Sequence, residues 1–186
     1  ILPWGLGYAV SGVVNTVAPQ ILGVPVNAGK ISVSVLSGTV AVRGFEIGNP
    51  EGFGTPYLLH ADELLVDFNI RELISGRNHI EEVRVIGPSV WYHRKLKESN
   101  ISAFLDSLDK RFPKDGKADN KEESKKGKTK PVVIDHFIFD EGKVGVKVGA
   151  GVEVPLAKIE LFDLGKDGAF MPIQIVRVIF GAVFDS

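Results

Sequence analysis

GTVAVRGFEIGNPEGFGTPYLLHADELLVDFNI, residues 38–70, is the stretch that decides the fold. Val40 and Val42 alternate with a small and a charged residue, and this period of two is typical of a half-buried strand. Gly44 shifts the phase of the alternation, because the apolar positions resume at Phe45. A glycine at a phase shift inside a strand predicts a β-bulge.

A turn and a second strand complete this stretch. The turn residues are Gly48, Asn49, Pro50, Glu51 and Gly52. Glycine and asparagine tolerate positive φ, and proline keeps the residue before it out of the helical region, so a turn or ordered loop is expected here. Every second residue from Leu64 to Ile70 is apolar, which predicts an amphipathic strand. The simplest interpretation is a hairpin-type connection between two strands.

The composition favours one β-rich domain. The chain of 186 residues is long enough to bury a core, and 44% of its residues are hydrophobic although 24% are charged. Its 21 glycines and its many valines and isoleucines favour strands. The net charge of −1 gives no general argument for nucleic acid, and the lack of cysteine excludes disulfides, thiolate zinc sites and cysteine nucleophiles.

Further alternation of apolar residues predicts the rest of the sheet. Strands are expected at residues 30–36, 80–86, 132–139 and 144–148, with an extended segment at 90–95 and a strand pair or bulged strand at 152–164. The turn at residues 140–143 predicts a hairpin between the strands on either side of it.

Helical spacing of apolar residues predicts three helices. The first covers about residues 4–18, with Pro19 near its end. The second covers residues 101–111, with Asn100 as its N-cap and an apolar stripe that faces the core. The third is the last element of the chain and has Pro172 in its first turn.

The charge distribution suggests the domain organisation. Residues 1–29 carry no charge, so we expect them to be an uncharged N-terminal helix or the remnant of a membrane anchor. A helix docked on the sheet, the exit end of an anchor and the remnant of a cleaved signal all remain open. Residues 30–186 are expected to form a single β-rich domain.

A basic loop is expected at residues 112–130 within that domain. The surrounding run from Lys110 to Lys130 holds nine basic and four acidic residues and is low in sequence complexity. A solvated loop is the favoured interpretation, and contact with anionic lipid headgroups is the alternative.

No catalytic constellation is recognisable. The sequence has no G-x-S-x-G element, no P-loop and no Rossmann glycine pattern, so we expect neither enzymatic activity nor a cofactor. Two groups of residues could suggest metal ligands: His60 with Asp62 and Glu63, and Asp135–His136 with Asp140–Glu141. Neither group has a recognised metal-ligand spacing. Neighbours along a strand also point to opposite faces, so no metal site is expected.

Aromatic and basic residues at 91–94 raise the question of nucleic-acid stacking. One aromatic pair beside a few cations is a weak signal for it, and a sheet edge is the favoured interpretation. We therefore expect no nucleic-acid partner.

Several elements resemble AsmA-like bacterial envelope proteins. Val42–Phe53 is similar to the family's GL-x-I-x-NP-x-GF element, and Ile86–Tyr92 with Ser99–Ile101 is similar to its I-x-GP-x-V-x-Y…N element. The segments that extend the resemblance are residues 14–26, 130–135 and 154–167. All these elements are structural, and none is catalytic.

The resemblance implies an α+β fold that is mostly β. Its centre would be a curved, groove-like antiparallel sheet, with an N-terminal helix, one mid-chain helix and a C-terminal helix packed on it. The residues expected to line an apolar groove are Leu64, Val66, Phe68, Val83, Val85, Val144, Val146 and Val148. The residues of the family's structural turn are Gly48, Asn49, Pro50, Gly52 and Phe53.

Two function hypotheses follow, and both place the protein at the periplasmic side of a bacterial membrane. The first is a non-enzymatic, membrane-associated protein that handles or shields lipid, or aids envelope assembly. The second is a structural accessory subunit of a larger membrane-associated complex, without a ligand. The expected partners are membrane lipid or other protein subunits, contacted through the N-terminal segment and the C-terminal helix. A two-sheet sandwich of the desiccation-related type, which also carries NP turns, is a third hypothesis.

Overall fold

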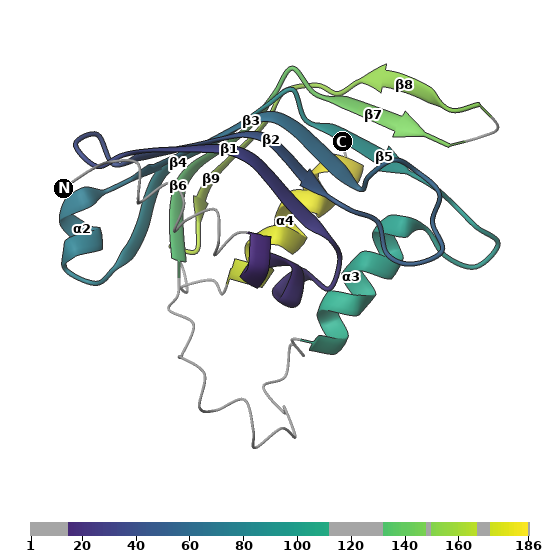
Figure 1. Ribbon diagram of the computed structural model, residues 1–186, viewed down its shortest axis with the longest axis horizontal. Helices are drawn as coiled ribbons and strands as arrows, with labels where there is room; N and C mark the ends of the chain where they lie inside the picture. The colour runs from purple at the N-terminus through teal and green to yellow at the C-terminus, as the bar shows by residue number, and fades with distance from the viewer. Residues whose placement is uncertain (1–14, 112–131, 148–149, 167–171, 186) are drawn as a thin grey trace.

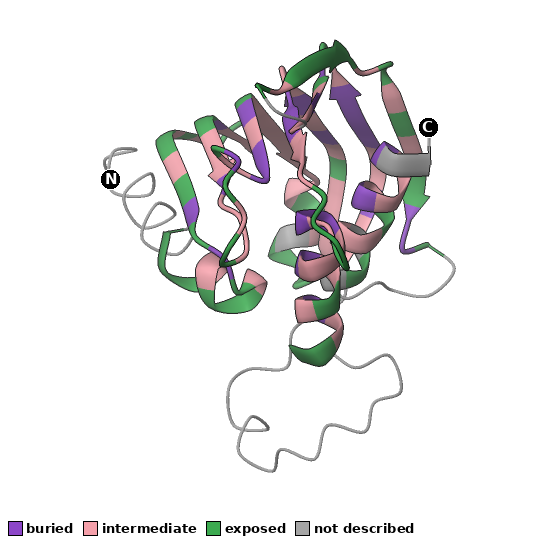
Figure 2. Ribbon diagram, turned by 90° about the vertical axis from the view of Figure 1, so that its right-hand side faces the viewer, coloured by how far each residue is buried: buried purple, intermediate pink, exposed green. Residues whose placement is uncertain are grey.

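The computed structural model describes residues 15–111, 132–147, 150–166 and 172–185 (Figure 1). These residues form a nine-stranded sheet that is curled into a half-barrel, with helices lying inside the curve (Figures 1 and 2). The strands are β1 (Val26–Ser34), β2 (Thr39–Ile47), β3 (Leu59–Phe68), β4 (Asn78–Ile86), β5 (Ser89–Tyr92), β6 (Val132–Asp140), β7 (Lys143–Val146), β8 (Val152–Pro155) and β9 (Ile159–Leu164). The predicted α+β class, mostly β with a curved sheet, is confirmed.

The second and third predicted helices lie close to their expected positions. The named helices are α2 (Ile70–Ile74), α3 (Asn100–Arg111) and α4 (Pro172–Asp185). Residues 15–22 are also helical, and this helix continues past Pro19, where we expected it to end. Gly23, at a φ of +73°, closes it by donating its N–H to the Pro19 carbonyl at 2.8 Å. Most of the predicted N-terminal helix, and the basic loop at 112–130, lie outside the described residues.

The sheet is mixed rather than purely antiparallel. β4 pairs with β6 in parallel, and β5 pairs with β7 in parallel. The predicted hairpin between residues 132–139 and 144–148 is therefore wrong, because β6 pairs with β4 and β9 while β7 pairs with β5 and β8. A parallel pair needs a long crossover connection, and here the segment that contains α3 supplies it.

The two parallel pairs belong to two bent strands that run side by side. Their register begins with Asn78 opposite Val132 and ends with Tyr92 opposite Val146, without a slip between the two pairs. The N–H of Gly87 donates to the Asp140 carbonyl at 3.0 Å and bridges the bend. β4 and β5 thus form one strand with a bend in it, and β6 and β7 form its neighbour.

The bends line up in a crease across five strands. The positions that the strand pairings skip, and which define the crease, are Gly29, Gly44, Asp62, Gly87 and Glu141. Inward-facing residues change phase there: Val42 and Phe45 of β2 both contact the core. The phase shift at Gly44 is confirmed and extends across the sheet, but the predicted bulge is wrong, because the register of β2 with β1 and β3 passes Gly44 without an extra residue.

Positive backbone angles at the crease lead to a prediction. Gly87 and Gly44 have φ values of +61° and +66°, which cost other residues about 1–2 kcal/mol. A Cβ on Gly87 would also lie 2.3 Å from Oδ2 of Asp62, whereas a Cβ on Gly44 would meet no atom within 4 Å. Gly87→Ala should therefore lower the free energy of unfolding more than Gly44→Ala in chemical denaturation.

The double variant Gly87→Ala/Asp62→Ala is the control for this prediction. Its loss of unfolding free energy should equal that of Gly44→Ala. Removing the Asp62 carboxylate relieves the steric clash, whereas the cost of a positive φ at residue 87 remains. Equal losses for all three variants would contradict the described geometry of the crease.

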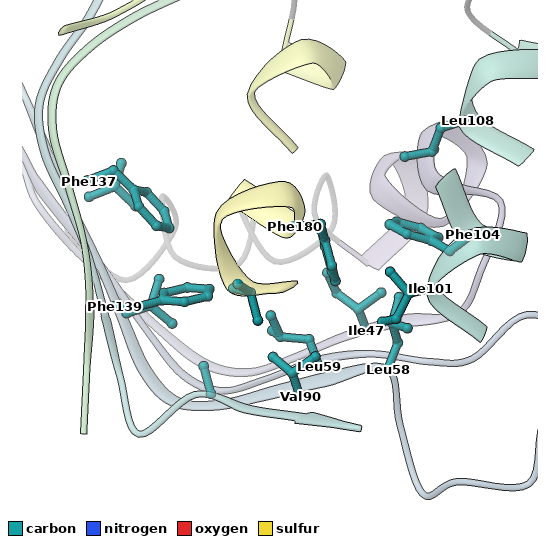
Figure 3. Packing of buried hydrophobic residues seen from close by; sticks show 14 of the residues in the cluster. Ile47, Leu58, Leu59, Val90, Ile101, Phe104, Leu108, Phe137, Phe139 and Phe180 are labelled. Carbon is teal, nitrogen blue, oxygen red and sulfur yellow. The ribbon is translucent and has the colours of Figure 1, made fainter. Parts of the chain in front are cut away.

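Helices α3 and α4 fill the inside of the curved sheet. Phe104 of α3 is fully buried and Phe180 of α4 is 3% exposed, with their ring centroids 5.3 Å apart. Figure 3 shows the Phe104 ring extending from α3 toward Phe180, whose ring is directed from α4 toward the sheet. Arg177 of α4 also binds Asp109 of α3, with 2.5 Å between Nη2 and Oδ1. The apolar stripe predicted for the second helix is therefore part of the core.

Candidate functional site

The residues predicted to line a groove fall into two groups. Val83 and Val85 are buried in the core beneath the helices, and Leu64 and Val66 are partly buried against the same cluster. Phe68 is also partly buried. On this half of the sheet, the apolar face is packed against the protein's own side chains.

The other half of the predicted groove lies on the outlying part of the sheet. Val144 and Val146 of β7 pair with Val154 and Val152 of β8. Val152 and Val154 are 62% and 47% exposed, and β8 is exposed along its whole length. Val144 packs against the core, Val152 and Val154 form an uncovered apolar edge, and Val148 lies outside the described residues.

The two elements that carry the family resemblance meet in the structure. Asn49 of the NP turn lies against Asn100 at the start of α3, and Asn100 Nδ2 donates to Asn49 Oδ1 at 3.0 Å. Asn49 Nδ2 in turn donates to the carbonyl and hydroxyl oxygens of Thr55, at 2.9 Å and 2.7 Å. The turn and the helix start are thus joined by a chain of side-chain hydrogen bonds.

Asn100 has no exposed surface and uses both ends of its amide. Its Oδ1 accepts the N–H groups of His93 and Ile101, at 2.9 Å and 3.1 Å, and its Nδ2 also donates to the Trp91 carbonyl at 2.6 Å. A fully satisfied buried amide fixes β5, the turn and α3 in one arrangement. We refer to Asn49, Thr55 and Asn100 with these partners as the asparagine junction.

The N-cap prediction for Asn100 is wrong, because that side chain is directed into the junction. Ser99 caps α3 instead: its Oγ accepts the N–H of Ser102 at 3.0 Å. Ser102 Oγ accepts the N–H of Ser99 at 2.8 Å in return, which is the reciprocal pattern of a capping box.

The predicted structural turn has the expected backbone. Gly48 donates its N–H to the Pro25 carbonyl at 2.7 Å. The N–H of Phe53 donates to the Pro50 carbonyl at 3.4 Å, and Gly52 between them has a φ of +84°. A residue with positive φ at this turn position is normally glycine, so the sequence explains the turn.

Three histidines on the outer face of the sheet each lie between two carboxylates. His79 nitrogens are 2.8 Å from oxygens of both Glu72 and Asp135. His136 is 3.4 Å from Glu82 and 3.1 Å from Glu160. The third is His60, whose carboxylate neighbours are Glu46 at 3.8 Å and Asp62 at 3.6 Å.

Asp135 and His136 are neighbours in β6, yet both point outward. We expected strand neighbours to face opposite sides, but the pairing skips Asp135 on both sides of β6. Ile134 and Phe137, on either side of the pair, are both buried in the core. The described residues contain no group of three histidine, cysteine or acidic side chains placed to hold a metal ion.

The hydrogen bonds of His79 predict a pH-dependent contribution to stability. Burial lowers the pKa of His79, but the hydrogen bonds with Asp135 and Glu72 outweigh burial and raise that pKa above 6.5. Charged His79 therefore stabilises the fold fully below pH 6.5, and this contribution is lost as the pH rises through the raised pKa. His79→Gln should cost roughly 0.5–1 kcal/mol more at about pH 6 than at about pH 8.5.

The matched control for this prediction is His93→Gln. The His93 ring accepts the N–H of Gly54 at 3.4 Å, which gives it a backbone partner instead of two carboxylates. Urea unfolding at both pH values should show no loss for this variant that is larger at the lower pH, because the contact with Gly54 needs a ring nitrogen without a proton. A pH dependence that is unaltered by His79→Gln would contradict the role given to His79.

A small polar hollow lies over the crease on the outer face. Its volume is about 210 Å³, and its lining includes Tyr57, His60, Asp62 and Lys143. The Tyr57 hydroxyl donates to Ser89 Oγ at 3.2 Å. The hollow mixes both signs of charge and contains no nucleophile activated by a base at hydrogen-bond distance, so it offers no argument for catalysis.

Neither the family models nor the curated proteins with which the chain was compared match it. Among the residues that the structure describes, none of the helices has both the length and the apolar character needed to cross a bilayer. The AsmA-like resemblance therefore stays a prediction that rests on the quoted sequence elements.

Sequence reasoning missed two features of the structure. The first is the contact between Asn49 and Asn100, which are 51 residues apart. The second is a set of large apolar side chains that are almost fully exposed at turns, above all Leu36 and Leu96. A leucine among the charged residues at 94–98 was a signal that could have been noticed.

Proposed function

We propose that the protein is a non-enzymatic, membrane-associated structural subunit that joins a partner subunit along the edge strand β8. The observation that supports this function best is the contrast between the concave face of the sheet and its edge strand β8. The concave side is filled by α3 and α4, with Phe104 and Phe180 at its centre. β8, by contrast, is exposed and pairs only with β7 among the described strands.

An edge strand with exposed apolar residues is a template for another strand. Its unpaired backbone groups bind a partner, and its side chains add apolar contact area. Natural proteins usually blunt such edges with charge, proline or a short strand; β8 has four residues and carries Glu153 and Pro155, yet Val152 and Val154 remain exposed apolar side chains. We therefore propose that a strand of another subunit extends the sheet at β8.

The test is the mass of the native assembly in mild detergent, measured by size exclusion with light scattering. The full chain should elute at a polypeptide mass well above 20.2 kDa. Val154→Lys should shift it to a smaller mass by placing a charge at the joint. Phe162→Ser is the matched control, because Phe162 is 62% exposed on another edge strand, β9. A single chain for the wild type, or equal effects of both variants, would contradict the proposal.

Lipid handling on the periplasmic side is the second candidate. The observation that favours it is the uncovered apolar surface that Val146 shares with Val152 and Val154. On the other half of the sheet, an acyl chain would have to displace α4 to reach Val83 and Val85. The second candidate therefore predicts a lipid bound near β7 and β8.

A further inference from the structure

The loop between β5 and α3 presents a large, exposed apolar side chain at its apex. Arg94 forms a bridge with Ser99, and the N–H of Lys95 donates to the Glu98 carbonyl at 2.8 Å. Leu96 and Lys97 are therefore the two central residues of a tight hairpin turn. Neither residue has a positive φ, so the turn does not demand glycine or asparagine, and Leu96 is 103% exposed at its apex.

The structure holds this apex away from the core. Lys95 Nζ donates to the Gly52 carbonyl and lies 4.7 Å from the centre of the Phe53 ring. The base of the loop is tied to the asparagine junction, because the Asn100 N–H donates to the His93 carbonyl at 3.0 Å. The exposure of Leu96 is thus a consequence of a braced loop.

The charges around Leu96 indicate what the loop contacts. Residues 94–98 contain three cations and one carboxylate, a net charge of +2, in a chain whose net charge is −1. An anionic lipid surface attracts each such cation by about 1 kcal/mol, and its interface accepts an apolar side chain between the headgroups. A nucleic acid would satisfy the cations but would leave Leu96 in water.

We propose that the loop at residues 94–98 docks the protein on an anionic lipid surface. Arg94 and Lys97 bind headgroup phosphates, Lys95 keeps the loop in place through Gly52 and Phe53, and Leu96 inserts into the interface. The inference rests on the proposed membrane association and adds the residues that make the contact. It does not depend on the joint at β8, because the loop and β8 are different segments of the surface.

The test is co-sedimentation of the full chain with lipid vesicles. One set is made of neutral phosphatidylcholine, and the other also contains anionic phosphatidylglycerol. The wild type should bind the anionic vesicles and not the neutral ones, and added salt should weaken binding because it screens the cations. Leu96→Ser should weaken binding about tenfold, and Lys97→Glu should weaken it at least about tenfold.

The matched control is Leu36→Ser. Leu36 is 100% exposed in the turn between β1 and β2, at the opposite end of the molecule (Figure 1), and no cation occurs at residues 35–38. This variant should change vesicle binding by less than about twofold. All three substitutions are at exposed positions, so the variants should remain folded.

Three outcomes would overturn the proposal. The first is equal binding to neutral and anionic vesicles, or none to either. The second is wild-type binding by Leu96→Ser. The third is that the wild type binds a labelled oligonucleotide more tightly than it binds anionic vesicles, and that Lys97→Glu weakens the oligonucleotide binding while Leu96→Ser does not. That result would assign the cations to nucleic acid. The assembly mass is measured without vesicles, so a failure of this proposal and a failure of the β8 joint are separate results.

Discussion

Replacing Asn100 with alanine is expected to lower the free energy of unfolding by about 3–4 kcal/mol. Asn100 has no exposed surface, and its amide bonds four groups: two backbone N–H groups, the Trp91 carbonyl and Asn49 Oδ1. Alanine leaves these groups without their partner in a site that water does not reach. Urea unfolding followed by tryptophan fluorescence measures the loss, because Trp91 lies at the junction.

The matched control is Ser99→Ala at the neighbouring position. Ser99 caps α3, and a lost N-cap costs about 1 kcal/mol. If Asn100 were an ordinary cap, the two variants would lose similar amounts. Equal losses of unfolding free energy for the two variants would therefore contradict the stabilising role given to the asparagine junction.

Phe104→Ala is expected to lower the free energy of unfolding by a similar amount, about 3–5 kcal/mol. Phe104 is fully buried and packs against Phe180, so alanine leaves a cavity between α3, α4 and the sheet. The loss should be seen in chemical denaturation, together with faster hydrogen exchange in α4. Faster exchange is expected because that helix loses its main contact with α3.

Leu96→Ala controls for the removal of a large apolar side chain. Leu96 is fully exposed, so its loss should change the free energy of unfolding by less than about 0.5 kcal/mol. A small loss for Phe104→Ala would mean that α3 does not close the concave face. The apolar sheet would then be open to a ligand.

Local patterns in the sequence identified most elements of the fold. Alternation located β3, β4 and β6, and the 3.6-residue spacing located α3 with its buried stripe. Such signals predict which face of an element is buried, since they depend only on nearby residues. They do not predict which strand lies alongside. The hairpin of β6 with β7 was therefore predicted wrongly, and the parallel pairing was not foreseen.

The crease was partly visible in the sequence. The phase shift at Gly44 was recognised, and a similar shift from Ala61 to Leu64 was not, although both of these residues contact the core. The asparagine junction was not predictable in the same way. Asn49 in a turn and Asn100 before a helix each have an ordinary local use, so nothing in the local sequence indicates that they meet.

The exposed surfaces were the hardest part to foresee. Hydropathy marks Val152, Val154 and Leu96 as apolar, but it does not show whether another element covers them. Covering depends on the path of α4, which lies between Phe137 and Phe139 of β6 and Leu59 of β3 (Figure 3), whereas β8 is exposed. The proposed function rests on this difference, which only the three-dimensional arrangement reveals.

The central claim is that the protein's own helices close the concave face, so that the chain acts as a structural subunit and not as a lipid holder. Native mass spectrometry of the full chain, released from mild detergent, tests this claim most directly. The account predicts an assembly whose mass is explained by polypeptide alone. A single chain of 20.2 kDa that retains lipid at a fixed stoichiometry would contradict it.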